Sequence, residues 1–414
     1  MCYTYVEAGR VLGQVSLRIT SDEEEEAVRR RISERLFIVI ALVVGLGGVL
    51  SSLGCEAPGV PEYPTPILPS AVKIAYVNGG EFWTMNLDGQ EPMLVAQGLE
   101  LRPEGCYPYY ISPDGHQVAY QTADGQFWMA DTRGPDRERL TERPVEAVSW
   151  FPDSSGLVYS FDDDIYVHWL KPPGPPRPIR TGGRRFLFPT WSPDGSYIAF
   201  LETTEAGVFS VNIVKSDGTG WRSLGTTAFA IGEVNLCPDI VAWSPDGTKL
   251  LVNYGQPAFV YYVAGGTPIQ VGGSDSVSSH RWSPDGQELA FEGEGSGLWL
   301  IRVDGSEERP LVDEAIDGFA WAPGRRLIVY NTTATRGLND LWVINVDVGE
   351  KHQLTVGDSY VELAPAWTPE GSRIVFQRVD VRGNEAGIWS VAPDGTDLQQ
   401  LSSVGTAVQV FTVR

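Results

Sequence analysis

One pentapeptide, Trp-Ser-Pro-Asp-Gly, occurs three times in the chain, at Trp191–Gly195, Trp243–Gly247 and Trp282–Gly286. Degenerate copies lie at Ile111–Gly115, Trp150–Asp153, Trp321–Gly324 and Trp367–Gly371. Successive copies are 39 to 52 residues apart. Self-similarity at such a period is typical of repeat architectures, and 414 residues exceed what one simple core organises. The chain is therefore predicted to be an array of units of about 40 residues.

A second element recurs once per unit, after a short alternating strand such as Tyr197–Phe200. Its clearest copies are Glu81–Gly89, Gly297–Gly305, Asp340–Gly349 and Gly387–Gly395. A last short strand then ends near Leu140, Leu311, Leu354 or Leu401. Eleven of the 13 tryptophans fall in the two repeated elements. Four short strands in about 40 residues predict a β-propeller blade, so the fold class is all-β.

The pentapeptide has a structural explanation. Ser, Pro, Asp and Gly in this order favour a type I turn, with proline fixing φ at the second position and glycine at the fourth. The turn joins the first two strands of a blade, and the later Asp-Gly pairs make the outer hairpin. The tryptophan before the turn buries on the order of 200 Å² where adjoining sheets meet. The repeated motif is therefore explained by its structural role in each blade and does not indicate a catalytic or binding site.

With these motifs, the chain resembles the TolB-like family of WD40-like PD40 propeller repeats, found in extracytoplasmic bacterial proteins. The resemblance covers residues 67–414. It departs from TolB itself because residues 1–66 do not read as an α/β domain, so TolB's own partners are not carried over.

The number of blades is predicted by counting the copies of the second repeated element. There are eight of them. They lie near Trp83, Trp128, Tyr166, Phe209, Tyr261, Trp299, Trp342 and Trp389. Eight blades are therefore predicted, with seven as the alternative. The first unit would have a decayed turn motif near Ile67 and Pro69. Thr406–Val413 reads as one more strand, which would pair into the first blade and close the ring.

The N-terminal part has the pattern of a membrane-targeting segment. Leu36–Leu53 has no charged residue and follows four arginines, which predicts a hydrophobic helix acting as a signal or transmembrane segment. Ser52-Leu53-Gly54-Cys55 resembles a bacterial lipobox, so Cys55 is the predicted lipidation site of a lipoprotein. An uncleaved signal anchor and ordinary secretion are the alternatives. Residues 1–35 would be the cytoplasmic or n-region, with translation from Val28 as a further alternative, and the proline-rich residues 56–66 a stiff linker.

The net charge of the chain limits the kinds of partner that it can bind. The chain has 31 Lys and Arg against 53 Asp and Glu, a net charge of −22. Phosphate binding needs clustered basic residues, so a nucleic-acid partner is excluded. The acidity is explained either by solubility or by a cationic or basic partner.

Catalytic and metal-binding motifs are not found in the sequence. There is no G-x-S-x-G, H-E-x-x-H, C-x-x-C or P-loop pattern. Asp162–Asp164 precede Ile165 and Tyr166 rather than the spaced oxygens and glycine of a calcium loop, so a polar hairpin turn is preferred. No metal and no cofactor are predicted, and the chain is more easily read as a non-enzyme.

Propeller ligands bind where loops converge at the mouth of the central channel. The candidate binding residues on these loops are Tyr107, Tyr109, Arg184, Arg185, Asp239, His280, Arg281, Tyr360 and Glu362. Each aromatic residue among them could instead belong to a blade core, and His280 and Arg281 could be packing or solvated residues. Cys106 and Cys237 precede their turn motifs by five and six residues, so both fall in loops on one face, where a disulfide is possible.

The preferred hypothesis is an extracytoplasmic, membrane-anchored binding or scaffold propeller, held by an N-terminal lipid or helix and recognising a protein, peptide or glycan. The alternative is a propeller hydrolase or lyase acting on cell-envelope peptides or sugars. A third hypothesis is a sensor whose residues 1–35 contact a cytoplasmic partner, which requires Leu36–Leu53 to remain uncleaved.

Overall fold

The computed structural model describes residues 2–7, 10–16 and 71–413, apart from 101–108, 135, 183, 205–207, 231–239, 254–256, 273–279, 294–296, 334–338, 357–359 and 381–384. The chain divides into two units, Met1–Ile67 and Leu68–Arg414. In the first, β1 (Cys2–Glu7) pairs with β2 (Arg10–Ser16) in antiparallel register. Leu36–Leu53, Cys55 and the linker 56–66 lie outside the described residues. Within the described part of the chain, no helix is long and apolar enough to cross a membrane.

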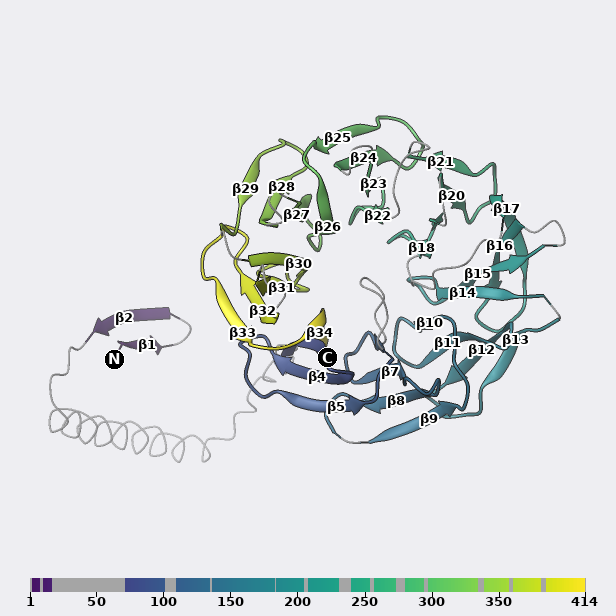
Figure 1. The fold of residues 1–414 in the computed structure, drawn as a ribbon, viewed down its shortest axis with the longest axis horizontal. Helices are drawn as coiled ribbons and strands as arrows, with labels where there is room; N and C mark the ends of the chain where they lie inside the picture. Colours follow the sequence, from purple (N-terminus) through teal and green to yellow (C-terminus); the bar gives the residue numbers. More distant parts are fainter. Residues whose placement is uncertain are drawn as a thin grey trace, which may run out of the picture. The chain divides into compact units, whose positions relative to one another are not determined.

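The second unit is a ring of eight four-stranded antiparallel sheets (Figure 1). Blade 1 consists of β34 (Thr406–Val413), β3 (Ala71–Asn78), β4 (Glu81–Asn86) and β5 (Met93–Gln97). Blade 2 consists of β6 (Tyr109–Ile111), β7 (Gln117–Gln121), β8 (Phe127–Asp131) and β9 (Arg137–Thr141). Blade 3 consists of β10 (Val148–Trp150), β11 (Gly156–Phe161), β12 (Asp164–Trp169) and β13 (Arg177–Arg180). Blade 4 consists of β14 (Phe186–Trp191), β15 (Tyr197–Thr203), β16 (Val208–Lys215) and β17 (Arg222–Ala230).

The second half of the ring repeats the plan. Blade 5 consists of β18 (Val241–Trp243), β19 (Lys249–Val252), β20 (Ala258–Tyr262) and β21 (Ile269–Val271). Blade 6 consists of β22 (Arg281–Trp282), β23 (Glu288–Glu292), β24 (Leu298–Arg302) and β25 (Arg309–Val312). Blade 7 consists of β26 (Ile316–Trp321), β27 (Leu327–Thr332), β28 (Leu341–Asn345) and β29 (Lys351–Gln353). Blade 8 consists of β30 (Tyr360–Trp367), β31 (Ile374–Asp380), β32 (Glu385–Val391) and β33 (Gln399–Ser402). The prediction of eight blades is confirmed, and the seven-blade alternative is wrong.

The ring is closed by its last strand. β34 is the innermost strand of blade 1 and pairs antiparallel with β3 from Ala71↔Val413 to Val77↔Thr406. Figure 1 shows β34, in yellow, beside the blue strands from the start of the propeller. The predicted closure by Thr406–Val413 is therefore confirmed. It explains why the first unit needs no turn motif of its own.

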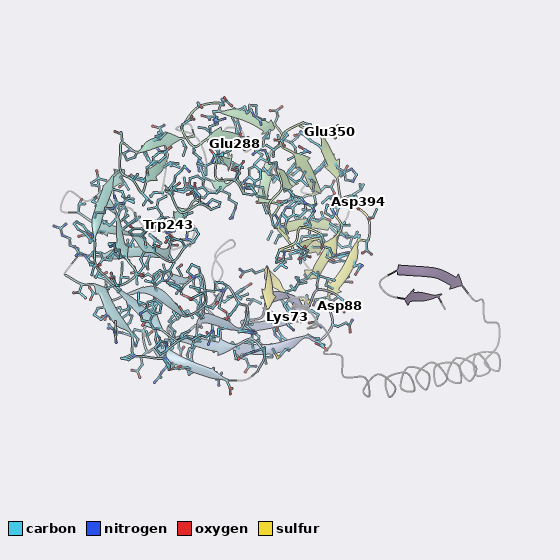
Figure 2. All side chains as sticks on the ribbon, turned by 180° about the vertical axis from the view of Figure 1, so that it is seen from behind. Lys73, Asp88, Trp243, Glu288, Glu350 and Asp394 are labelled. Carbon is cyan, nitrogen blue, oxygen red and sulfur yellow. The ribbon has the colours of Figure 1, made fainter. Side chains whose placement is uncertain are left out.

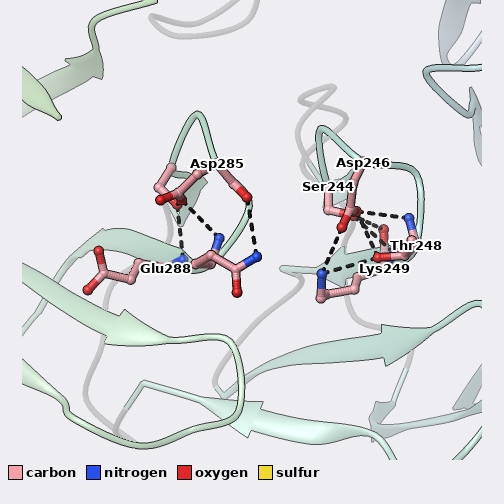
Figure 3. A network of polar contacts seen from close by, with 8 residues as sticks. Ser244, Asp246, Thr248, Lys249, Asp285 and Glu288 are labelled. Atoms are coloured by element: carbon pink, nitrogen blue, oxygen red, sulfur yellow. Dashed lines mark hydrogen bonds and ion pairs between the residues drawn. The ribbon is translucent and has the colours of Figure 1, made fainter. Parts of the chain in front are cut away.

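The Trp-Ser-Pro-Asp-Gly segment makes the expected turn between the first and second strands of a blade. In the copy at Ser244, the Gly247 N–H donates to the Ser244 carbonyl at 2.9 Å. The Ser244 hydroxyl donates to Asp246 Oδ1 at 2.6 Å, and the same Oδ1 accepts the Thr248 N–H at 3.0 Å (Figure 3). The glycine has φ of +67°, a conformation that residues with a Cβ rarely adopt. The prediction of a type I turn is confirmed.

The tryptophan of the motif joins neighbouring blades. Trp282 Nε1 donates to the carbonyl of Ala242 at 3.2 Å, and Ala242 directly precedes the motif tryptophan of blade 5. The same bond runs from Trp150 to Tyr110, from Trp243 to Thr190 and from Trp367 to Ala320. At Trp191 the pattern is broken, because its buried Nε1 finds no acceptor among the described residues and its ring packs edge-on against Phe151 at 4.6 Å.

This difference between the tryptophans gives a stability prediction. We expect Trp282→Phe to lower the free energy of unfolding by about 1 kcal/mol more than Trp321→Phe does, because only Trp282 loses a hydrogen bond that satisfies a neighbouring carbonyl. Trp321 is partly buried like Trp282, and its Nε1 has no partner among the described residues, so Trp321→Phe is the matched control. Equal losses in urea unfolding would contradict a role for the Nε1 bond in holding blades together.

Hydrophobic clusters fill the spaces between blades, and most of them draw residues from two. One cluster combines Ala290 and Leu300 of blade 6 with Ile328 and Tyr330 of blade 7. Outside these clusters, the turn between the third and fourth strands lies on the outer strand of the preceding blade. A Cβ on Gly89 would come within 2.5 Å of the Leu401 carbonyl, and His352 Nε2 lies 2.7 Å from the Asp394 carbonyl. Asp88, Glu350 and Asp394, from three successive turns of this kind, follow one another along the rim in Figure 2. The ring is thus held at its core by tryptophans and at its rim by turns.

Candidate functional site

The two ends of the ring differ in construction. One end carries the Ser-Pro-Asp-Gly turns, which are short and closely hydrogen-bonded. The opposite end, called here the entrance face, carries the loops that lead into the innermost strands and the loops between second and third strands. Side chains that could meet a ligand are therefore sought where these loops join the strands.

On blades 2 to 4 the predicted site residues serve packing and bridges between blades. Tyr109 is buried, and its ring packs on Phe82 at 4.5 Å. Arg184 lies 3.6 Å from Glu202 within blade 4. Arg185 Nη2 donates to Glu146 Oε1 at 2.6 Å, and its Nε lies 3.5 Å from Asp163, so this guanidinium joins blade 4 to blade 3.

His280 is a buried histidine just before β22. Its side chain is 5% exposed and stacks on Phe291, with ring centroids 4.7 Å apart. Neither ring nitrogen has a hydrogen-bond partner among the residues that the structure describes. Burial lowers the pKa of His280 to about 4, so the imidazole is neutral at neutral pH. Arg281, next along the chain, is exposed.

The buried His280 predicts a dependence of stability on pH. An unfolded histidine titrates near 6.5 and His280 near 4, so the stabilisation is complete above pH 6.5 and is lost as pH falls toward 4. The difference corresponds to about 3 kcal/mol. We expect His280→Phe, which keeps a ring on Phe291, to remove most of this loss in urea unfolding at pH 7.0 and 4.5. His352→Phe, at an exposed site, should keep the wild-type pH dependence, and an unchanged slope in His280→Phe would contradict the assignment.

Glu362 and Arg378 form a buried ion pair in blade 8. Arg378 donates from Nε and Nη2 to Glu362 Oε1, at 3.0 and 2.6 Å, and the two side chains are 8% and 2% exposed. The guanidinium lies over three rings, 4.6 Å from the centroid of Trp389, 5.1 Å from Tyr360 and 5.6 Å from Phe376. Burial raises the pKa of Glu362, against the opposing effect of Arg378. Glu362 Oε2 is buried and has no hydrogen-bond partner in the described part of the chain.

Blades 6 to 8 connect these groups into one polar cluster. Asn331 Nδ2 donates to the Glu362 carbonyl at 3.0 Å, and the Glu362 N–H donates to the Asn339 carbonyl at 3.1 Å. Asn339 Nδ2 reaches Asp317 Oδ2 at 3.4 Å. Burial raises the pKa of Glu292, and the charge of Asp317 acts in the same direction. The entrance cluster is defined here as His280, Glu292, Asp317, Asn331, Asn339, Glu362 and Arg378.

Sequence reasoning found only part of this cluster. His280 and Glu362 were predicted, and Tyr360 lies at its edge, 37% exposed. Glu292, Asp317, Asn331, Asn339 and Arg378 were missed. A usable signal existed for two of them, since a polar residue directly follows the buried aromatic of the second strand in several blades, as in Tyr120-Gln121, Phe291-Glu292 and Tyr330-Asn331. Gln121 accepts the Val145 N–H of the next blade, as Asn331 donates to Glu362.

The remaining predicted positions are outside the described residues. These are Tyr107, Asp239 and the cysteines Cys106 and Cys237, so the disulfide stays a prediction. Among the residues that the structure does describe, no three His, Cys, Asp or Glu side chains gather as a metal site. The chemistry of the entrance cluster is that of hydrogen-bond acceptors and carboxylates with one buried guanidinium.

The geometry defines the class of the protein as an eight-bladed β-propeller with a polar cluster on one face. Its blades and turn motifs are consistent with the TolB-like propeller repeat family that the sequence resembles. No family model matches the chain. Among solved structures, a protein assigned as TolB from Agrobacterium tumefaciens is 18% identical, covering 67% of this chain and 94% of that one, at a TM-score of 0.37. Dihydro-heme d1 dehydrogenase, in complex with its ligand, gives a TM-score of 0.62 at 13% identity, covering 86% of this chain and 78% of that one, which supports the fold alone.

Two curated relatives share part of the sequence. An uncharacterized protein of Agrobacterium fabrum is 26% identical over 205 residues, which are 47% of this chain and 66% of the relative. An uncharacterized peptidase of Bacillus subtilis is 24% identical over 187 residues, which are 42% of this chain and 26% of that peptidase. The match thus spans less than two thirds of either relative's length.

Proposed function

We propose that the chain is a binding propeller rather than an enzyme, and that its entrance cluster recognises a basic segment of a protein or peptide partner. The observation that carries the proposal is the convergence of the half-buried Glu292 and the exposed Asp317 from adjacent blades, beside the buried pair of Glu362 and Arg378 in blade 8. These two carboxylates give the entrance cluster an acidic recognition surface on a rigid scaffold. The net charge of −22 extends the same field over the chain and favours encounter with a basic partner.

Binding at the entrance cluster is testable without knowing the partner. A photoreactive residue is placed at Tyr360, which is 37% exposed beside the cluster, and in a second variant at Trp221, 43% exposed in a turn at the other end of blade 4. In the native host we expect adducts from position 360 and few from 221. Asp317→Lys should reduce the adducts at 360 at least fivefold, whereas Asp217→Lys, the same reversal beside Trp221, should not. Equal labelling at both positions would refute the proposal.

The alternative is a hydrolase acting on peptides, and one observation favours it. A relative of this chain is described as a peptidase, although the match covers 26% of it. Turnover of fluorogenic peptides by the purified protein, abolished in Glu292→Gln, would favour this alternative. We expect no turnover by the wild-type protein; if turnover is found, Glu308→Gln is the control that should retain it.

We further propose that the propeller is displayed outside the cytoplasmic membrane and is anchored there by its N-terminal segment. Support comes from the sequence alone, in the uncharged run Leu36–Leu53, the preceding arginines and the lipobox-like residues up to Cys55. The intact mass of the protein from host membranes tests it. A mass beginning at acylated Cys55 supports a lipoprotein, one that retains residues 1–54 supports a signal anchor, and recovery from the soluble cytoplasmic fraction refutes both.

A further inference from the structure

A cavity of about 670 Å³ lies between blades 2 and 3, away from the entrance cluster. Its walls are the outer strand β9, through Glu138, Arg139 and Leu140, and the end of β12, through His168. The turn that follows β12, from Leu170 to Pro176, makes the opposite wall. The volume falls within the range of small-ligand and side-chain pockets.

The sequence explains why the space between the two blades is open here. In several blades the turn between third and fourth strands contains Asp-Gly and lies on the preceding outer strand, as at Gly305, where an added Cβ would lie 3.1 Å from the Gln270 carbonyl oxygen. In blade 3 this turn reads Lys-Pro-Pro-Gly-Pro-Pro, which is longer and stiffened by proline. A Cβ added to Gly174 would meet no described atom within 4 Å. Lys171 reaches back to blade 2 instead, 3.7 Å from Asp114, so the turn spans the seam without filling it.

The cavity combines an apolar wall with acceptors for hydrogen bonds. Met129, Leu140 and Leu170 supply the apolar part. His168 is buried, and its Nδ1 has no hydrogen-bond partner among the described residues.

Both arginines of β9 contact other groups, and Glu138 is the carboxylate of this strand that can meet a ligand. Arg137 lies over the Trp128 ring at 5.6 Å, and Arg139 is bound to Glu142 at 3.0 Å. Glu138 has no ion-pair partner in the described part of the chain, and it faces the cavity wall as an exposed acid. A cation on an apolar stem therefore matches the cavity better than an anion does.

We propose that this cavity and the free edge of β9 form a second binding site, for an extended peptide segment that carries a lysine or arginine two positions from an apolar residue. β9 is the last strand of its sheet, and no described strand pairs with its outer edge. An extended peptide can add to such an edge by main-chain hydrogen bonds, while alternate side chains enter a neighbouring pocket. The basic side chain reaches Glu138, and the apolar side chain two positions along, on the same face of the added strand, covers Leu140 and Leu170.

The test uses a fluorescein-labelled peptide, Thr-Lys-Thr-Leu-Thr-amide, and its Glu-for-Lys counterpart, titrated by fluorescence anisotropy into the full chain at 150 mM salt. Gly174→Trp should weaken binding of the lysine peptide at least tenfold by occupying the cavity. Gly134→Trp, at a glycine of the corresponding turn of blade 2 that also has open space around it, is the matched control and should change binding less than twofold. Glu138→Gln should weaken binding at least fivefold, and Glu308→Gln, the same loss of charge beside β25, less than twofold.

The outcomes separate this site from the entrance cluster. Asp317→Lys should leave the affinity for the peptide unchanged. If Asp317→Lys abolishes binding and Gly174→Trp does not, the peptide binds at the entrance cluster, which overturns this inference and leaves the proposed function standing. Equal affinity for the two peptides, or no binding of the lysine peptide up to millimolar concentration, overturns the inference as well.

Discussion

Deleting β34 is expected to abolish the cooperative unfolding of the propeller. The truncated chain ends at Gly405, and β3 loses the strand that pairs with it from Ala71 to Val77. The inner edge of β3 becomes exposed, and Ile74 and Tyr76, which are buried in the intact chain, lose part of their cover. The expected loss is at least about 5 kcal/mol, a large part of the stability of an ordinary domain. Thermal unfolding and light scattering measure the loss of the transition and the gain of aggregates.

A permuted chain is the control for this deletion. Val413 pairs with Ala71, so Thr406–Val413 can be inserted directly before Ala71 through a tight turn, giving the same strand order. We expect the permuted chain to recover most of the wild-type melting temperature. A truncated chain with the melting temperature of the wild type would show that ring closure by β34 does not contribute to the stability of the propeller.

Much of this fold is predictable because short segments of adjacent residues determine its turns and strands. Each Ser-Pro-Asp-Gly turn is fixed by four adjacent residues, as at Ser244–Gly247, so the motif marks the first and second strands wherever it occurs. Counting the second elements, each centred on a Trp, Tyr or Phe, then gives eight blades. The closing strand was also predictable, since Thr406–Val413 reads as one more strand after eight second elements, and pairing it into the first blade removes an exposed edge.

The entrance cluster was less predictable, because it depends on contacts between blades. Asn331 and Glu362 are 31 positions apart, and they meet because the second strand of one blade bonds the first strand of the next. Arg378 was missed because a charged residue two positions after Ile374-Val375-Phe376 breaks the alternation that identifies a strand. Its burial depends on three rings from β30, β31 and β32, and no local pattern reports that arrangement.

Replacing Glu362 alone should be far more damaging than replacing the pair. In Glu362→Leu the Arg378 guanidinium stays buried without its carboxylate, and we expect the free energy of unfolding to fall by about 3–5 kcal/mol. In the double variant Glu362→Leu with Arg378→Met no charge is left buried, so most of that loss should be recovered. Urea unfolding at pH 7 measures both.

A partly exposed pair provides the comparison. Arg326 contacts Glu288 but also Asp347 and Asp285, and its side chain is 30% exposed. Glu288→Leu should therefore cost less than about 1 kcal/mol, because the guanidinium keeps water and two other carboxylates. If Glu362→Leu costs no more than Glu288→Leu, the buried pair contributes little and its geometry needs another explanation.

The double variant also separates stability from binding. A buried ion pair is commonly no more stabilising than apolar side chains of the same volume, so stability alone does not account for Glu362 and Arg378. If the double variant folds with wild-type stability but the adducts at position 360 disappear, the pair serves recognition at the entrance cluster. If stability and adducts are both retained, Glu362 is a packing residue, and the acidic surface around Asp317 and Glu292 must carry the binding on its own.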